Sequence, residues 1–511
     1  MRPVRLPVPA WGHNGPVHRS NGTSNDRSEV GADFLQLDPG EAPVGGLADW
    51  LARRLRQAIR DGRLPLGSRL PPSRLLAAEL GVSRGVVTEA YQRLGEDGHV
   101  RGRGRNGTVV VAAPPPIPAP ARLAPSGPPP VPGALFAGPP GPGVFDALRA
   151  VPADIDLSPG TPDLAAFPRA AWLRAERAVL TDLAWAGLGY GDPRGAPELR
   201  RAVAHWLARN RGIRVDPEEV LITAGTAQAL TLAARVLGDA GVGAIAVEDP
   251  GSLGVRQHLG GQGMATPPVP VDAEGLRVDA LRGTGARAVL LTPAHQFPTG
   301  VVLSGDRRRA LLGWAAEGGL IVEDDYDAEH RYDRPPVPAL RSMLPERVLY
   351  AGSVSKLLAP ALRVGWVLAP PEHREALVAA KRLADLGNAA LPQLVLARLL
   401  ESGEVERQLR LLRRRHRRRR DAMVAAIRER LPGAAVTGAA AGLHLMVTFD
   451  GEFADTGLAA AALARGVKVQ PLSWHRQLPH GPGLVLGYAA RTPTEIDRGV
   501  AVLAAVLRGL R

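Results

Sequence analysis

A run of prolines divides this chain into parts that must fold separately. Residues 112–142 contain thirteen prolines. Proline fixes the backbone and lacks the N–H that helices and sheets use, so this run is expected to form a semi-rigid polyproline linker. We expect the linker to extend over residues 112–150, between a small domain, 34–111, and a large domain, 151–511. Residues 1–33 lack an apolar period and are expected to be a disordered extension.

The composition excludes several classes of protein. The chain has no cysteine, which excludes disulfides and thiolate metal sites, and no metal site is expected. No apolar run reaches the length of a membrane span, and the polar N-terminus is unlike a secretory signal. These features favour a cytoplasmic protein without a membrane partner. The net charge of +13 suggests a polyanionic partner.

The first part of the small domain predicts three helices. Apolar residues recur at helical spacing over residues 49–59. Ser73 is expected to cap a second helix, 74–80, and Ser83 to cap a third helix, 84–94. Two helices joined by a short Gly-containing turn form a helix-turn-helix, whose second helix normally enters the major groove of DNA.

The rest of the small domain predicts a basic hairpin, or wing. Strand-like residues 99–101 and 108–111 flank the turn-forming sequence Gly102-Arg103-Gly104-Arg105-Asn106-Gly107. Residues 45–111 contain twelve Arg against six Asp and Glu, a balance that favours phosphate binding. The alternative is a small helical docking module with a solvated basic surface.

The small domain resembles the winged-helix domain of GntR-family regulators. The resemblance lies in Leu70-Pro71-Pro72-Ser73-Arg74, Leu80-Gly81-Val82-Ser83-Arg84, Tyr91 and Gly107-Thr108. It implies a double-stranded DNA operator as partner. Many members of that family carry arginine at the position of Thr88. The residues that the resemblance assigns to DNA are Arg74, Ser83, Arg84 and Thr88 in the helices, and Arg103, Gly104 and Arg105 in the wing, in or near the minor groove.

The large domain alternates apolar strand-like runs with helical ones. The runs include residues 220–223, 244–247, 288–291, 320–322 and 348–350. Apolar strands separated by helices indicate an α/β domain with a mainly parallel sheet.

Lys356 is the most informative residue of the large domain. The chain has three lysines against sixty arginines. Arginine supplies charge but no amine that can lose its proton, whereas imine formation with a carbonyl requires a neutral lysine. Taken alone, this lysine could equally have escaped a codon bias toward arginine by chance. The surrounding residues decide between a chemical role and chance.

Three further signals accompany this lysine. Gly225, Thr226 and Ala227 follow a strand and open a helix, where free N–H groups can hold a phosphate. Residues 323–327 contain carboxylates and a tyrosine at the end of an expected strand. Residues 292–300, which include His295, form a turn-rich segment that follows a different expected strand. Ser353, Ser355 and Arg363 flank Lys356 and offer two hydroxyls and a bidentate phosphate donor. A cofactor with an aldehyde, a pyridine nitrogen, a phenolic oxygen and a phosphate would use this whole set, and pyridoxal 5′-phosphate fits every requirement.

From about residue 154 to 500 the chain resembles a fold-type I aminotransferase. Tyr190-Gly191-Asp192-Pro193-Arg194-Gly195 and His295-Gln296-Phe297-Pro298-Thr299-Gly300 match, as do residues 323–327. A GntR-like domain, a long linker and an aminotransferase-like domain, in this order, are typical of MocR-type regulators. The resemblance implies the following roles: Lys356 as the imine-forming and catalytic residue, Asp324 at the pyridine nitrogen, Tyr326 at the phenolic oxygen, Arg363, Ser353, Ser355 and Thr226 at the phosphate, and Gly225, Ala227 and His295 beside them.

Two departures from the aminotransferase pattern bear on function. Ser252 stands where an aromatic residue usually stacks on the cofactor. In aminotransferases a C-terminal arginine clamps the substrate carboxylate, whereas residues 484–488 contain no arginine, and Arg491 lies three residues further on. Loss of the clamp harms the orientation of an amino acid substrate.

These observations favour a DNA-binding transcription regulator, a homodimer, whose large domain binds pyridoxal phosphate as a sensor. The effector would be the cofactor itself or an amino acid or amine, with vitamin B6 or amine metabolism genes as targets. Alternatives are a working aminotransferase with an appended DNA-binding domain, and a cofactor-free scaffold. Nine arginines in residues 407–420 predict a helix with a solvated basic face or, alternatively, a second surface for DNA.

Overall fold

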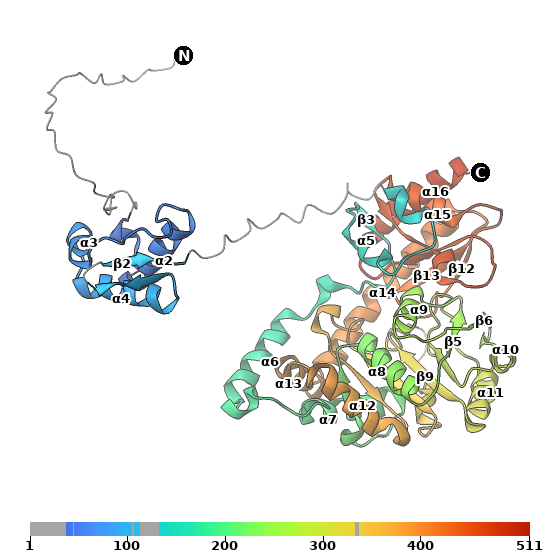
Figure 1. Ribbon diagram of the computed structural model, residues 1–511. Helices are drawn as coiled ribbons and strands as arrows, with labels where there is room; N and C mark the ends of the chain where they lie inside the picture. The colour runs from blue at the N-terminus through green and yellow to red at the C-terminus, as the bar shows by residue number, and fades with distance from the viewer. Residues whose placement is uncertain (1–36, 44, 105–106, 113–131, 333–336, 511) are drawn as a thin grey trace, which may run out of the picture. The chain divides into compact units, whose positions relative to one another are not determined.

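The computed structural model describes residues 37–43, 45–104, 107–112, 132–332 and 337–510. It divides into two compact units, Met1–Gly127 and Pro128–Arg511 (Figure 1). The extension expected at residues 1–33 and most of the expected linker lie outside the described residues.

The N-terminal unit is the predicted winged helix. Its elements are α2 (Leu47–Arg60), α3 (Ser73–Glu79), α4 (Arg84–Glu96), β1 (Val100–Gly102) and β2 (Thr108–Val110). The strands pair antiparallel, with Val100 opposite Val110. Leu55, Leu76 and Leu94, one from each helix, are fully buried in a common core.

The two expected helix caps differ in outcome. The Ser83 hydroxyl accepts a hydrogen bond from the Val86 amide, as a cap does. Ser73, in contrast, is the first residue of α3, and Pro72 is the capping residue without a side-chain bond, so the cap expected at Ser73 is wrong. A proline directly before the first helical turn already fixes the extended backbone that a cap residue adopts.

Two elements of the C-terminal unit lie within the expected linker. The turn η3 (Pro132–Phe136) and helix α5 (Val144–Ala150) belong to the C-terminal unit, where Phe136, Val144 and Leu148 are buried in the core. These apolar residues interrupt the proline run and give the segment a surface to bury. The structure therefore differs from a linker that continues to residue 150.

An eight-stranded sheet forms the centre of the C-terminal unit. Five adjacent strands, β10, β9, β8, β5 and β6, are parallel, whereas β11 is antiparallel to both β10 and β4. The mainly parallel sheet of the prediction is confirmed. The strand order is β4 (Leu221–Thr223), β11 (Gly365–Leu368), β10 (Val348–Ser353), β9 (Leu320–Asp325), β8 (Ala288–Leu291), β5 (Ile245–Asp249), β6 (Pro268–Asp272) and β7 (Gly275–Leu276).

Helices cover both faces of this sheet (Figure 1). Successive residues of a strand point to opposite faces: Leu320 and Val322 pack on one side and Ile321 on the other, and all three are buried. The first face packs against α8 (Thr226–Asp239), α9 (Leu253–Gly260) and α12 (Pro371–Asp385). The second packs against α7 (Pro197–Arg211), α10 (Val278–Gly283), α11 (Gly305–Ala316) and α13 (Ala390–Glu401), with α6 (Arg169–Asp182) beside α13.

A second, smaller lobe surrounds a four-stranded sheet in the order β12-β13-β16-β15. A separate parallel pair, β3 with β14, packs in the same core as α5. The elements are β3 (Ile155–Asp156), β12 (Ala435–Thr437), β13 (His444–Thr448), α15 (Asp455–Leu463), β14 (Val467–Lys468), β15 (Gln470–Pro471), β16 (Gly483–Gly487) and α16 (Pro493–Leu510).

The arginine-rich segment lies in the 27-residue helix α14 (Glu404–Arg430). Leu409 and Leu412 are buried, as a packed helix requires. Several arginines make internal contacts: Arg413 donates to the Glu329 carbonyl, and Arg419 pairs with Asp163 at 2.8 Å. Among the residues that the structure describes, no helix is long and apolar enough to cross a membrane.

Candidate functional site

A cavity of about 1010 Å³ lies beyond the carboxyl ends of the parallel strands. Its walls come from both lobes of the C-terminal unit. Eight of the sequence-predicted residues line it together: Thr226, Ala227, Asp324, Tyr326, Ser353, Ser355, Lys356 and Arg363. Of the other two, Gly225 immediately precedes α8, and His295 contacts Tyr326 behind the wall.

The end of β9 concentrates buried carboxylates. Glu323 accepts hydrogen bonds from the amides of Leu340 and Arg341, both at 3.0 Å. Asp325 pairs with buried Arg211 at 2.5 Å.

Asp324 lines the cavity, whereas Glu323 and Asp325 do not. Its Oδ1 is buried and has no hydrogen-bond partner; Asp325 Oδ1 is also unpartnered, but Asp325 Oδ2 is paired with Arg211. Burial, with the neighbouring carboxylates Asp325 and Asp327, raises the pKa of Asp324 to about 7. A buried acceptor without a partner, in a cavity wall, is a place for a ligand's N–H group.

Behind Asp324, a histidine links Tyr326 to Asp327. His295 Nδ1 lies 3.0 Å from the Tyr326 hydroxyl and 2.9 Å from Asp327 Oδ2. Burial raises the pKa of Tyr326 well above its usual value, so the hydroxyl keeps its proton and can donate it to a ligand oxygen. His295, Asp327 and His444 bring three potential metal-ligand atoms within 4.8 Å of one another. Contacts to Asp327 and Tyr326 already engage His295 Nδ1, and the absence of a metal remains a prediction.

Lys356 faces the same space. Its ammonium donates to the Gly160 carbonyl at 2.5 Å. Burial lowers the pKa of Lys356, against the opposing pull of Asp327 and Asp324. A lowered pKa increases the fraction of neutral amine, which is the nucleophilic form.

An anion cradle forms where α8 begins. Helices leave their first N–H groups unbonded, and those of α8 start at Thr226 and Ala227. The Arg363 guanidinium donates to the Ala224 carbonyl, and a Cβ added at Gly225 would lie 3.3 Å from it. Gly225 has φ +80°, a backbone conformation that favours glycine, and the missing side chain leaves room for the guanidinium.

The structure adds cavity residues that the sequence analysis did not assign to the site. Glu248 is buried, which raises its pKa to about 7, and it accepts from the amide and hydroxyl of Thr292. Lys468 from β14 and Phe145 from α5 also line the cavity. Composition signalled Lys468 as one of three lysines, but only the fold places it near Lys356. No sequence signal pointed to Phe145.

The two departures from the aminotransferase pattern have structural counterparts. Ser252 caps α9, accepting from the Val255 amide, and it lines the cavity. Val485, in the stretch without an arginine, is fully buried against Met446 and Leu472. Arg491 donates to the Asp156 carbonyl at 3.0 Å and is not among the residues that line the cavity.

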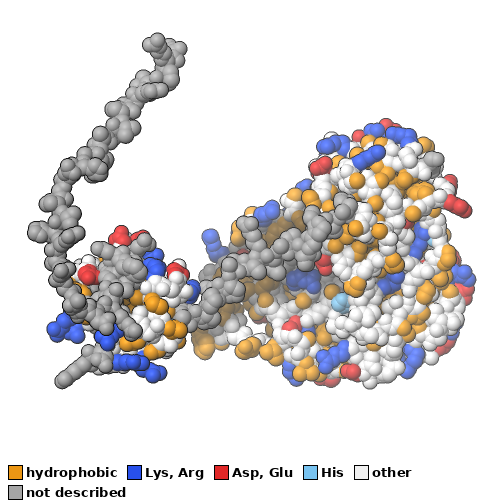
Figure 2. Space-filling model, turned by 45° about the horizontal axis from the view of Figure 1, so that its top comes forward, with side chains coloured by type: hydrophobic (Ala, Val, Ile, Leu, Met, Phe, Trp, Pro, Cys, Tyr) orange, Lys and Arg blue, Asp and Glu red, His pale blue; other side chains and the backbone are white. Residues whose placement is uncertain are grey.

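The DNA-binding candidates are exposed on the N-terminal unit. Arg74, Ser83, Arg84 and Thr88 lie on or beside the helix-turn-helix, and Arg103 and Gly104 begin the wing tip. Figure 2 shows basic side chains gathered on this unit. Thr88 donates its hydroxyl to the Arg84 carbonyl at 2.9 Å. Arg105 lies outside the described residues.

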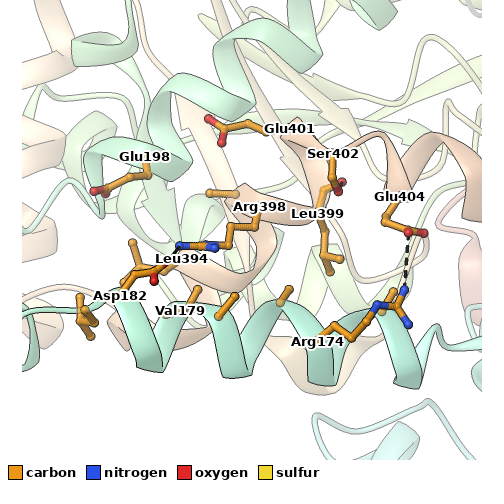
Figure 3. A pocket seen from close by; sticks show the side chains of 15 residues that line it. Arg174, Val179, Asp182, Glu198, Leu394, Arg398, Leu399, Glu401, Ser402 and Glu404 are labelled. Atoms are coloured by element: carbon orange, nitrogen blue, oxygen red, sulfur yellow. Dashed lines mark hydrogen bonds and ion pairs between the residues drawn. The ribbon is translucent and has the colours of Figure 1, made fainter.

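A second hollow, of about 790 Å³, lies between α6 and α13 (Figure 3). Ion pairs cross it, from Arg398 to Asp182 at 2.5 Å and from Arg174 to Glu404 at 3.7 Å. It contains no residue assigned to cofactor or DNA, so we assign it no function.

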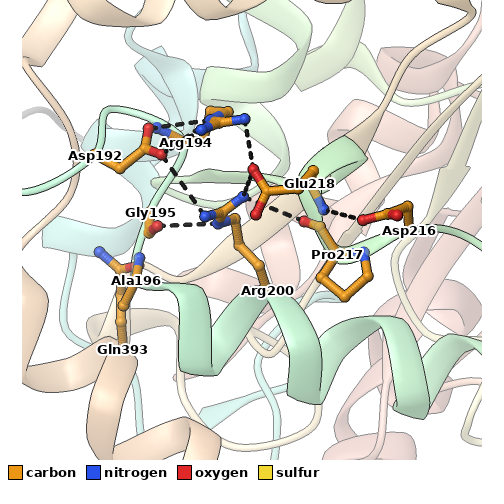
Figure 4. Close-up of polar contacts among 9 residues, drawn as sticks. All are labelled: Asp192, Arg194, Gly195, Ala196, Arg200, Asp216, Pro217, Glu218 and Gln393. Atoms are coloured by element: carbon orange, nitrogen blue, oxygen red, sulfur yellow. Dashed lines mark hydrogen bonds and ion pairs between the residues drawn. The ribbon is translucent and has the colours of Figure 1, made fainter.

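Beyond α6 the chain carries an apolar loop. Trp185, Leu188 and Tyr190 are 88%, 66% and 96% exposed. A network of ion pairs follows directly (Figure 4): Arg194 contacts Asp192 and Glu218, both at 2.7 Å, and Arg200 contacts Glu218 at 3.0 Å. The loop is therefore anchored at one end while its apolar side chains face outward.

Comparisons with known proteins cover both units. Residues 47–110 match the family described as bacterial regulatory proteins, gntR family, and residues 153–503 match aminotransferase class I and II. The chain is similar to the probable rhizopine catabolism regulatory protein MocR of Rhizobium meliloti, with 33% identity covering 88% of this chain and 91% of that protein. It is also similar to the pyridoxine biosynthesis transcriptional regulator PdxR of Corynebacterium glutamicum, with 33% identity covering 83% and 87%.

Solved structures similar to the chain are aminotransferases. The kynurenine aminotransferase of Pyrococcus horikoshii has a TM-score of 0.65 and 28% identity, covering 72% of this chain and 93% of that one. LysN, the α-aminoadipate aminotransferase of Thermus thermophilus, has a TM-score of 0.65 and 31% identity, covering 72% and 94%. Similarity to regulators over both units, and to enzymes over the C-terminal unit alone, favours regulation over the enzyme alternative. The chain therefore belongs to the MocR-type transcription regulators, in which a DNA-binding GntR-family winged helix precedes a domain of the aminotransferase class I and II family.

Proposed function

We propose that this regulator binds pyridoxal 5′-phosphate in the cavity of its C-terminal unit and uses the occupancy of that cavity to control DNA binding. The observation that carries the proposal is the unpartnered, buried Oδ1 of Asp324, in the same cavity wall as the low-pKa amine of Lys356. When bound, the cofactor supplies an aldehyde for that amine and a pyridine ring that accepts electrons.

The chain's own residues account for each part of the cofactor. Lys356 would take the aldehyde, Asp324 the pyridine N–H, and Tyr326 the phenolic oxygen. The cradle of Gly225, Thr226, Ala227, Arg363, Ser353 and Ser355 would hold the phosphate, with His295 orienting Tyr326.

Sensing is favoured over catalysis by two residues. Val485 is part of a buried apolar cluster in the stretch where aminotransferases carry their carboxylate-clamp arginine. Ser252 has no aromatic ring that could stack on the cofactor. Because correct orientation of the substrate contributes much of an enzyme's rate, these two changes should lower the rate of transamination more than the affinity for ligands. The name of the relative PdxR supports pyridoxal phosphate itself as the signal and vitamin B6 genes as targets, whereas that of MocR supports an amine or amino acid effector. Contact with DNA would place the protein in the cytoplasm, at the nucleoid.

Purified protein is expected to be yellow, with a visible absorption band that disappears in Lys356→Ala. Lys356→Arg serves as a matched control for charge, because arginine keeps the cation but cannot form the imine. Absorption spectra of the three proteins, with circular dichroism to show folding, provide the measurement. A visible band that persists in folded Lys356→Ala would exclude this lysine as the attachment point.

We expect Arg84→Ala to weaken operator binding, since Arg84 is exposed at the first turn of α4. A base contact would cost about 1–3 kcal/mol and relax specificity, whereas a phosphate contact would cost affinity for all sequences and reduce the salt dependence. Arg54→Ala, on α2 and paired with Glu41, is the control. Gel shifts at several salt concentrations, on operator DNA and on unrelated DNA, separate these cases, and wild-type operator affinity in Arg84→Ala would contradict both.

The protein is expected to be a homodimer through its C-terminal unit, because the outward-facing apolar loop needs a partner surface. Trp185→Glu should then shift the mass measured by light scattering towards the monomer. Met343→Glu, also at an exposed apolar side chain but outside the loop, should not. A wild-type chain that stays monomeric at micromolar concentration would rule out the dimer.

A further inference from the structure

The cavity is also lined by cationic side chains that were not assigned to the cofactor. Besides Lys356 and Arg363, the cations that line it are Lys468 and Arg149. Lys468 is only 4% exposed, whereas Arg149 lies on the surface and pairs with Asp146. Lys468 is therefore the buried charge of this region.

The ammonium of Lys468 is under-bonded for a buried charge. It donates one hydrogen bond, at 2.6 Å, to the carbonyl of Val151. Its nearest carboxylate oxygen, Asp156 Oδ2, lies at 3.8 Å, beyond hydrogen-bond distance. An ammonium has three donors, and a buried charge with unused donors is costly unless an anion or another acceptor meets it.

The same ammonium holds the helix that follows the linker. Val151 is the C-terminal cap of α5, where helix carbonyls carry partial negative charge. α5 in turn places Phe145, Leu148 and Arg149 in the cavity wall. Phe145 packs near Gly254, where an added Cβ would lie 3.6 Å from its ring. A ligand that reaches Lys468 therefore also meets α5.

We propose that Lys468 is an anion subsite of the cofactor cavity and selects effectors that carry a carboxylate, such as amino acids, over the corresponding amines. It would take the role of the carboxylate-clamp arginine that is missing from residues 484–488. The carboxylate would share the ammonium with the Val151 carbonyl, so binding would act directly on the end of α5. This inference rests on the proposed function, because the cofactor must occupy the remainder of the cavity.

The test uses full-length protein loaded with pyridoxal phosphate and three ligand pairs: glycine with methylamine, L-leucine with 3-methylbutylamine, and L-phenylalanine with 2-phenylethylamine. Titration of the visible spectrum gives the affinity ratio of acid to amine in each pair. Because hydrogen bonds to charged groups are strong, we expect at least one acid to bind about tenfold more tightly than its amine in the wild type. The affinity ratio of acid to amine should fall to about one in Lys468→Met and should remain partly above one in Lys468→Arg.

The controls separate this inference from the function on which it rests. The visible band without ligand should remain in Lys468→Met; its absence in the wild type would instead overturn the proposed function. Lys468→Gln, whose amide can still donate to Val151, replaces Lys468→Met if the latter does not fold, and should also lose the preference. An unchanged ratio in the folded variant would mean that Lys468 only holds α5. Equal binding of acids and amines by the wild type, or no response to any of them, would also overturn the subsite.

Discussion

The site depends on a row of carboxylates buried at the end of β9. Each charge there would be costly without a partner, and the fold supplies partners individually: backbone amides for Glu323, Arg211 for Asp325 and His295 for Asp327. The Oδ1 atoms of Asp324 and Asp325 are both buried without a hydrogen-bond partner, but only Asp324 lines the cavity, whereas Asp325 is paired with Arg211 through Oδ2. The fold thus leaves an acceptor of Asp324 free in the same cavity wall as Lys356, and a ligand N–H group or a proton on Asp324 would offset the cost of its burial.

Helix α5 forms part of the cavity wall and is the element through which we propose that the ligand acts. This helix is the first one described after the proline run, and its side chains form part of the cavity wall. The core residues Phe136 and Leu148 fix it to the smaller lobe, and Phe136 stacks on Trp474 with ring centroids 5.2 Å apart. A ligand that alters this wall would therefore act on α5, and the proposed coupling to DNA binding requires no contact between ligand and DNA.

The sequence predicted the two domain types and most of the polar residues that the structure brings together in one cavity, because these depend on local signals: a glycine turn before a helix, carboxylates at a strand end, and a rare lysine. It could not predict Lys468, Glu248 or Phe145 as cavity residues, because tertiary packing alone brings β14, β5 and α5 to the same space. The expected linker continued too far along the chain, because Phe136, Val144 and Leu148 are buried in the core of the C-terminal unit. Burial of these apolar side chains stabilises a folded segment despite the prolines around them. The Ser73 cap was wrong because Pro72 already fixes the backbone before α3.

The central claim, that occupancy of the cavity and DNA binding are coupled, is tested most directly by reciprocal titration. Operator affinity is measured with and without pyridoxal phosphate, and cofactor affinity is measured with and without operator. Thermodynamic linkage requires the two ratios to be equal, and a coupling of about 1–3 kcal/mol predicts a change of roughly 5- to 150-fold in each. An operator affinity that the cofactor leaves unchanged, with no amino acid or amine restoring a difference, would contradict the account.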